Sequence, residues 1–189
     1  MPRTDDIHSL PPNLPVPVDD GACGQLEGSP IPPIRFRSTS GGAIDLSTER
    51  GRIVVYVYPR TGRPDQDLPA GWNEIPGARG CTPQSCGFRD HAAALAARGA
   101  RVAGLSVQSL HEQLELAERL HIPYPVIADP ERKLGAALRL PTFDFEGLTL
   151  YKRVTLVLEQ GRIAKVFYPV FPPDRHAGEV VAWLEARQD

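Results

Sequence analysis

The chain lacks the features that mark several large classes of protein. Its 189 residues contain no apolar run close to the roughly 20 residues that a membrane-spanning helix needs. The N-terminus does not have the basic flank and apolar core of a secretory signal peptide. The formal net charge of -2 gives no excess of positive charge for nucleic acid or an anionic membrane surface. These absences predict a cytoplasmic protein that binds neither nucleic acid nor membrane.

Cysteine is scarce, and the odd number of three does not suggest the disulfide framework of a secreted domain. The chain also has no Gly-x-Ser-x-Gly elbow, no glycine-rich phosphate loop and no paired-carboxylate pattern. Two of the cysteines, Cys81 and Cys86, nevertheless lie only five positions apart. In a cytoplasmic protein such a pair indicates catalysis, redox sensing or metal binding, and composition does not choose among them.

Proline is concentrated at the N-terminal end, where eight of the 20 prolines fall within the first 33 residues. We therefore predict a proline-rich arm over residues 1–25, packed on the domain or on a second subunit, and one domain over residues 26–189. Residues 61–80 join an expected strand to an expected helix. Such connections usually have about 2–6 residues, so this one is predicted to be a long active-site loop or an insertion.

The pattern of apolar residues predicts alternating strands and helices. We expect strands at 34–37, 43–46, 53–58, 101–107 and 124–128, helices at 83–98, 110–120, 131–138 and 180–186, and a hairpin over 153–159 and 162–168. Strands that alternate with crossover helices favour a partly parallel sheet, and the late hairpin adds antiparallel edges. The prediction is an α/β protein with a mixed central β-sheet flanked by helices, of the thioredoxin-like type.

Cys81 is expected at the start of the first helix, where backbone N–H groups and the helix dipole favour a thiolate. In an ideal helix, residues five apart have Cα atoms roughly 8–9 Å apart, about 140° around the axis. A disulfide needs Cα atoms within about 7 Å, so Cys81 and Cys86 can bond only if the first turn unwinds. Pro83 makes this unwinding plausible because it supplies no N–H to hold the turn closed.

Residues 80–90, Gly-Cys-Thr-Pro-Gln-Ser-Cys-Gly-Phe-Arg-Asp, resemble the two-cysteine signature of the peroxiredoxins. The similarity is to the Q-type, or bacterioferritin-comigratory, branch of the alkyl hydroperoxide reductase/thiol-specific antioxidant family, and it spans roughly residues 28–187. It implies a thioredoxin-like fold and an enzyme that reduces hydrogen peroxide or organic hydroperoxides without metal, haem or flavin. It also implies a thioredoxin-like dithiol as the protein reductant, and a monomer or homodimer.

By this resemblance Cys81 is the peroxidatic cysteine, Cys86 resolves it, and Arg153 steadies the thiolate and the peroxide. A fixed cation polarises the O–O bond as negative charge moves onto the leaving oxygen, which supports the last assignment. The family usually has a threonine or serine three residues before the peroxidatic cysteine, where this chain has Ala78. Thr61 is the candidate to supply that hydroxyl if the long loop folds back, and Thr82 is a weaker one.

Other readings of these residues stay open at this point. A thiol–disulfide oxidoreductase or redox sensor is one, and a binding module that has lost turnover with the missing threonine is another. A zinc site is weakly supported, because His91 follows Cys86 by five residues but no second pair of ligands is present. Cys23 is expected to be a free surface or semi-buried thiol, able to resolve Cys81 across a subunit interface.

Overall fold

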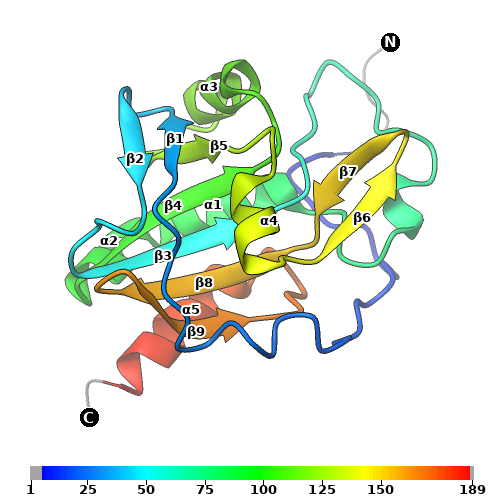
Figure 1. Ribbon diagram of the computed structural model, residues 1–189. Helices are drawn as coiled ribbons and strands as arrows, with labels where there is room; N and C mark the ends of the chain where they lie inside the picture. Colours follow the sequence, from blue (N-terminus) through cyan, green and yellow to red (C-terminus); the bar gives the residue numbers. More distant parts are fainter. Residues whose placement is uncertain (1–5, 188–189) are drawn as a thin grey trace.

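The computed structural model describes residues 6–187, and its centre is a seven-stranded mixed sheet with the order β2-β1-β5-β4-β3-β8-β9 (Figure 1). Strands β3, β4 and β5 are parallel, whereas β8 pairs antiparallel with β3 and β9 with β8. This confirms the predicted parallel section and late hairpin. The strands are β1 (Arg35–Ser38), β2 (Ala43–Asp45), β3 (Arg52–Val57), β4 (Ala100–Ser106), β5 (Val126–Ala128), β8 (Val154–Glu159) and β9 (Arg162–Phe167).

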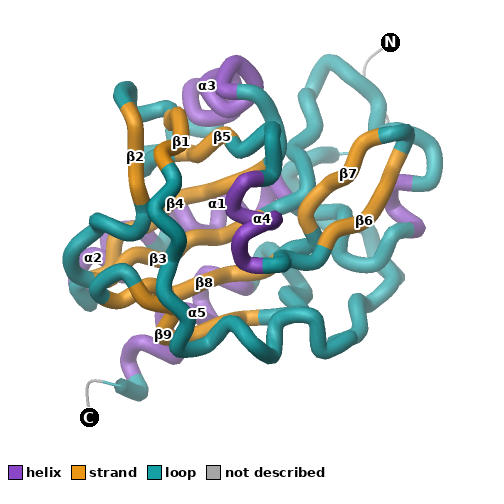
Figure 2. Tube along the Cα trace, in the orientation of Figure 1, coloured by secondary structure: helices purple, strands orange, loops and turns teal. Residues whose placement is uncertain are grey.

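Helices cover both faces of this sheet, as Figures 1 and 2 show. Among the described residues, none of them is long and apolar enough to cross a membrane. The helices are α1 (Cys81–Asp90), α2 (Ala92–Ala97), α3 (Leu110–Arg119), α4 (Lys133–Leu138), α5 (His176–Glu185) and the 3-10 turn η1 (Trp72–Glu74).

Strand β3 is apolar at every position after Arg52 because both of its faces are buried. Side chains alternate along a strand, so Val54 and Tyr56 contribute to the core that contains Phe88 of α1 and Leu95 of α2. The alternate residues of β3, Ile53, Val55 and Val57, belong to the second core, which contains residues of α4 and of the N-terminal segment. The strand thereby fixes the position of α1, which begins with Cys81.

The predicted helix over 83–98 is two helices, and this expectation is corrected. The first helix begins earlier, at Cys81, and ends before His91, where α2 follows. The His91 Nδ1 lies 2.8 Å from the Gly87 carbonyl oxygen that also accepts the His91 backbone N–H. His91 is the C-cap of α1, with φ -96° and ψ 2°, and this non-helical backbone conformation separates the two helices.

A two-stranded hairpin, β6 (Thr142–Phe145) and β7 (Leu148–Tyr151), is absent from the sequence prediction. It stands apart from the main sheet beside the 61–80 loop (Figure 1). Trp72 of the loop contacts the rings of Phe143 and Phe145, with ring centroids 6.1 Å and 5.1 Å away. The loop and the hairpin therefore share a small apolar core of their own, which also contains Ala78 and Leu150.

The described part of the N-terminal arm packs on the domain. Ile7 is buried, and the Asp20 carboxylate accepts hydrogen bonds from Lys152 at 2.9 Å and from the Tyr168 hydroxyl at 2.8 Å. Cys23 is 6% exposed and belongs to the main core, so the expectation of a surface or semi-buried thiol is wrong. Residues 1–5 of the predicted arm lie outside the described residues, and the division at residue 26 stays a prediction.

His176 begins α5 as a fully buried imidazole. Its Nδ1 lies 2.9 Å from the Glu179 carboxylate and its Nε2 lies 2.9 Å from the Thr155 hydroxyl, so both ring nitrogens have partners. The rings of Phe88 and Phe167 pack against it. Burial lowers the pKa of His176, and the carboxylate of Glu179 opposes this shift without reversing it.

We expect the free energy of unfolding to fall as the pH drops below about 6.5, the ordinary histidine value. Below that pH the unfolded chain binds a proton at His176 that the folded chain, with its lowered pKa, does not bind. One such site contributes at most about 1.4 kcal/mol per pH unit. Urea unfolding at pH 7.5 and pH 5.5 measures the effect.

His176→Gln should remove this part of the pH dependence, whereas His111→Gln, at an exposed position, should keep it. An equal pH dependence in His176→Gln and the unsubstituted protein would show that another group causes it.

Candidate active site

Cys81 is the first residue of α1, and the preceding Gly80 makes this position possible. Gly80 has φ 106°, and a Cβ there would collide with the side chains of Pro173 and Leu10. The chain can therefore turn sharply into the helix, which leaves the 3% exposed Cys81 at its N-terminal end. Unpaired backbone N–H groups and the helix dipole favour a thiolate at this place.

Arg153 brings a buried positive charge to this cysteine. Its Nη2 lies 3.3 Å from Cys81 Sγ and also donates to the carbonyl oxygens of residues 77, 78 and 79 at 3.1–3.2 Å. The residue is 3% exposed and stands directly before β8. No carboxylate within residues 6–187 forms an ion pair with it. A thiolate at Cys81 would supply the missing negative charge.

Gln84 is a member of this cluster that the sequence prediction missed. Its Oε1 accepts a hydrogen bond from Arg153 Nη1 at 2.5 Å, and its side chain is fully buried. The spacing of three residues between Cys81 and Gln84 was the available signal, because such residues share one side of a helix.

Cys86 lies further along α1 and is half-buried. It packs against the edge of the core formed by α1, α2 and α5, and all three cysteines are free thiols. Burial raises the pKa of Cys86, while the nearby charge of Arg89 opposes the shift. Arg89 itself pairs locally with Asp90 at 2.8 Å. Cys86 is therefore a thiol at neutral pH.

Comparison with known proteins places this arrangement in a family. The model of the Redoxin family matches residues 26–181. Peroxiredoxin Q of Oryza sativa subsp. japonica, a chloroplastic protein, is 30% identical over 167 residues, which cover 87% of this chain and 69% of the rice protein. The chain belongs to the redoxin family. Thiol peroxidase function, expected from the two-cysteine signature, is the function that this membership supports.

Other similar proteins carry the same kind of name. The redoxin chain is 26% identical to peroxiredoxin Bcp of Bacillus subtilis (strain 168) over 163 residues, which cover 84% of this chain and 94% of the other. The crystal structure of peroxidoxin BcpB from Mycobacterium tuberculosis has a TM-score of 0.68 at 24% identity, covering 85% of this chain and 97% of that one. Peroxiredoxin Q of Xanthomonas campestris has a TM-score of 0.65 at 18% identity, covering 92% and 98%. These likenesses confirm the thioredoxin-like fold.

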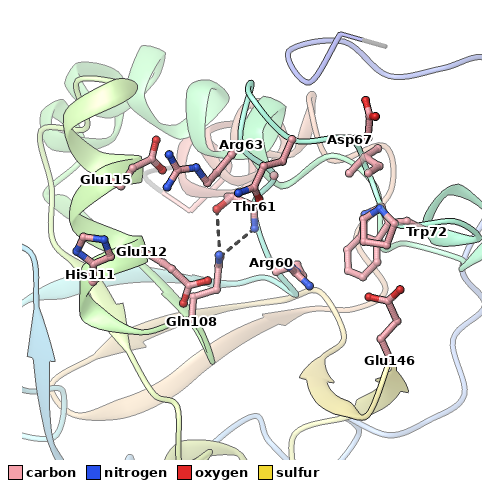
Figure 3. A pocket seen from close by; sticks show the side chains of 14 residues that line it. Arg60, Thr61, Arg63, Asp67, Trp72, Gln108, His111, Glu112, Glu115 and Glu146 are labelled. Atoms are coloured by element: carbon pink, nitrogen blue, oxygen red, sulfur yellow. Dashed lines mark hydrogen bonds between the residues drawn. The ribbon is translucent and has the colours of Figure 1, made fainter. Parts of the chain in front are cut away.

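Thr61 of this redoxin lines a pocket whose lining includes neither Cys81 nor Arg153. Figure 3 shows it between Arg60 and Arg63, with its N–H and hydroxyl both directed at Gln108. The N–H donates to Gln108 Oε1 at 2.9 Å and the hydroxyl at 3.1 Å. Thr61 is 7% exposed, and none of the described hydrogen bonds joins it to Cys81 or Arg153.

The segment between the long loop and Cys81 is held from both sides. The three carbonyls of residues 77–79 accept from Arg153, and Arg79 Nη2 donates outward to the carbonyl oxygens of Asp6 and Ser9 at 2.8 Å and 3.4 Å. Arg79 is buried. The arm and the guanidinium of Arg153 together fix the backbone that leads into α1.

The zinc alternative finds no support in the described part of the chain. Among residues 6–187, no group of three or more histidine, cysteine or acidic side chains is placed to hold a metal ion. The Nδ1 of His91 instead contacts the Gly87 carbonyl in its own helix turn.

We expect Arg153→Met to lower the fraction of thiolate in this redoxin at pH 7, because the buried cation that faces Cys81 would be lost. Absorbance at 240 nm measures the thiolate. At this pH the signal reports Cys81 alone, because burial raises the pKa of Cys86 and raises that of Cys23 to about 12.

Arg101→Met is the matched control, since the Arg101 side chain is 57% exposed, pairs with Glu49 at the surface and donates to the Arg50 carbonyl oxygen. The control should keep the thiolate signal. A folded Arg153→Met protein with an undiminished signal would contradict the assigned role of Arg153.

Proposed function

We propose that this redoxin reduces hydroperoxides by an atypical two-cysteine mechanism, with Cys81 as nucleophile, Cys86 as resolving thiol and Arg153 as electrostatic partner. The observation that carries the proposal is the 3.3 Å contact between Arg153 Nη2 and Cys81 Sγ at the start of a helix. Two sources of positive potential, the guanidinium and the helix N-terminus, converge there on one buried sulfur. Neither Cys23 nor Cys86 has this environment.

In the first step the Cys81 thiolate attacks one peroxide oxygen. A sulfur–oxygen bond forms while the O–O bond breaks, and the electron pair leaves on the second oxygen, which takes up a proton to become water or an alcohol. The sulfur is oxidised to a sulfenic acid and the peroxide is reduced. Arg153 stabilises the negative charge that gathers on the oxygens as the bond breaks.

In the second step the Cys86 thiol attacks the Cys81 sulfenic sulfur, a disulfide forms and the hydroxyl leaves as water. The turn that contains Cys81 must unwind first, because cysteines five apart in a helix are too distant to bond. Ser85 is held to the sheet side by the Tyr56 and Tyr124 hydroxyls at 3.1 Å and 3.0 Å. Unwinding can thus involve the residues before Ser85 while Cys86 keeps its place.

A cleft beside Arg153 supports a substrate range that includes organic hydroperoxides. A mostly apolar cleft of about 420 Å³ is lined by Arg153 together with side chains of the arm, the 61–80 loop and the end of β9. Such a lining suits the carbon chain of an organic hydroperoxide as well as hydrogen peroxide. Its apolar members include Val16, Pro17, Val18, Ile75, Phe143 and Val170.

The regeneration step needs two electrons, which we assign to a thioredoxin-like dithiol protein that attacks the Cys81–Cys86 disulfide by thiol exchange. Cys86 is the more exposed of the two sulfurs before oxidation and gives the reductant its access. A monomer or homodimer in the cytoplasm remains our prediction for the working form.

We expect one equivalent of hydrogen peroxide to produce a Cys81–Cys86 disulfide within seconds in the reduced protein. Mass spectrometry of alkylated, digested protein identifies the linked peptides. Cys86→Ser should stop at a sulfenic acid that dimedone traps at Cys81, and Cys81→Ser should not react.

Cys23→Ser is the control, and it should form the same disulfide because Cys23 is buried in the core away from this reaction. Absence of any change at Cys81 over minutes would overturn the peroxidase proposal. Oxidation of Cys81 with Cys86 still free would overturn only the resolving step.

The role of Thr61 gives a separate prediction. If its hydroxyl serves the peroxide after the long loop moves, Thr61→Ala should slow the reaction of Cys81 with peroxide about 100-fold, the lower end of the range for loss of one preorganised hydrogen-bonding group. Stopped-flow fluorescence with the reduced protein measures the rate. Thr48→Ala, at an exposed turn, is the control. Unchanged kinetics in Thr61→Ala would exclude Thr61 from this role.

A further inference from the structure

Gln84 has one side-chain atom for which the folded, reduced protein provides no partner. Its Nε2 is buried, and no hydrogen-bond acceptor lies within reach of it. Gln84 is 0% exposed, so its amide does not face bulk solvent. A buried amide nitrogen without a partner costs free energy, and such atoms in native proteins call for an explanation.

The orientation of this amide is fixed by its neighbour. A guanidinium can only donate hydrogen bonds, so the atom that Arg153 Nη1 contacts at 2.5 Å must be the amide oxygen. Rotating the amide to exchange its ends would place N–H groups against the Arg153 N–H groups. The two donors of Nε2 are therefore directed away from Arg153 and remain unused.

Gln84 and the reacting sulfur of Cys81 contact the same guanidinium group. Arg153 contacts Gln84 through Nη1 and Cys81 through Nη2, so the amide and the sulfur sit side by side along the edge of one planar group. Cys81 and Gln84 are also three residues apart in α1, on the same side of the helix. An oxygen added to the sulfur would bring an acceptor into this space.

We propose that Gln84 is a further catalytic residue, whose Nε2 donates a hydrogen bond to the oxygen that Cys81 takes from the peroxide. This inference rests on the proposed peroxidase function. Negative charge develops on the peroxide oxygens as the O–O bond breaks, and a preorganised N–H directed there stabilises the transition state more than the ground state. The Gln84 Nε2 donor has no hydrogen-bond partner in the reduced enzyme and gains one in the sulfenic state.

The test compares Gln84→Glu and Gln84→Met with Gln25→Glu, an equal change of charge at an exposed position. A carboxylate at position 84 still accepts from Arg153 but donates nothing, and methionine does neither. The rate constant with hydrogen peroxide is measured at a pH where the Cys81 thiolate absorbance at 240 nm has reached its plateau. This choice removes any effect of the substitution on thiol ionisation.

Both Gln84 variants should react about 100- to 1,000-fold more slowly, and Gln25→Glu should react like the unsubstituted protein. The Gln84→Glu rate should partly recover at lower pH, once corrected for thiolate content, because a protonated carboxyl group can donate again. Plateau rates equal to that of the unsubstituted protein would overturn the donor role and leave Gln84 as a positioning residue for Arg153. If the unsubstituted protein itself does not react, the proposed function fails rather than this inference.

A second measurement keeps Gln84 intact and does not depend on how the variants fold. In the Cys86→Ser protein, one equivalent of peroxide should leave Cys81 as sulfenic acid. The side-chain amide signals of Gln84 in a ¹⁵N–¹H NMR spectrum should then move downfield, while those of Gln25 stay in place. Gln84 signals that do not move on formation of the sulfenic acid would overturn the proposal.

Discussion

The buried guanidinium of Arg153 is the constraint on which the rest of this site depends. A charge removed from water must be compensated, and the described residues offer Arg153 no carboxylate, only carbonyl oxygens, the Gln84 amide and the Cys81 sulfur. The carbonyls of residues 77–79 must therefore face inward, which sets the path of the chain into α1. A negatively charged sulfur at Cys81 would compensate the same charge.

The central sheet holds Arg153 and Cys81 in their relative positions. Arg153 precedes β8, which pairs with β3 along its whole length, and β3 in turn supports α1 through Tyr56 and Phe88. The cation and the sulfur are thus held by two neighbouring strands of one rigid sheet. Small movements of the surface loops do not change their separation, which suits a contact that must be maintained before the substrate arrives.

The sequence predicts the parts of this arrangement that depend on local pattern. The apolar run of β3 and the position of Cys81 at a helix start follow from periodicity and from the motif itself. The pairing of Cys81 with Arg153 does not, because 72 positions separate them and only a family resemblance suggested it. The β6–β7 hairpin had a period-2 signal around Gly147, but the segment is short and lies outside the main sheet.

The local sequence pattern does not explain why residue 78 is an alanine. It is fully buried in the small core that the long loop makes with Trp72 and Leu150. A threonine hydroxyl at this position would face apolar side chains and would need a partner. Alanine at position 78 therefore packs with Trp72 and Leu150 without leaving a buried hydroxyl unpaired. Any hydroxyl that serves the peroxide has to come from another segment, and Thr61 is bound to Gln108 at present.

The contacts that favour the Cys81 thiolate also hold the first turn of α1 closed, and the proposed cycle requires that turn to open. Oxidation itself relieves this conflict. A sulfenic acid at Cys81 is neutral, so Arg153 loses the charge that compensated its burial, and the hydrogen bond to sulfur weakens. In the proposed cycle this lost ionic contact outweighs the hydrogen bond that the Gln84 amide would gain, so the folded turn is less favourable than it was before the reaction. Local unwinding toward Cys86 follows from the chemical step, and before that step the charged pair keeps the turn folded.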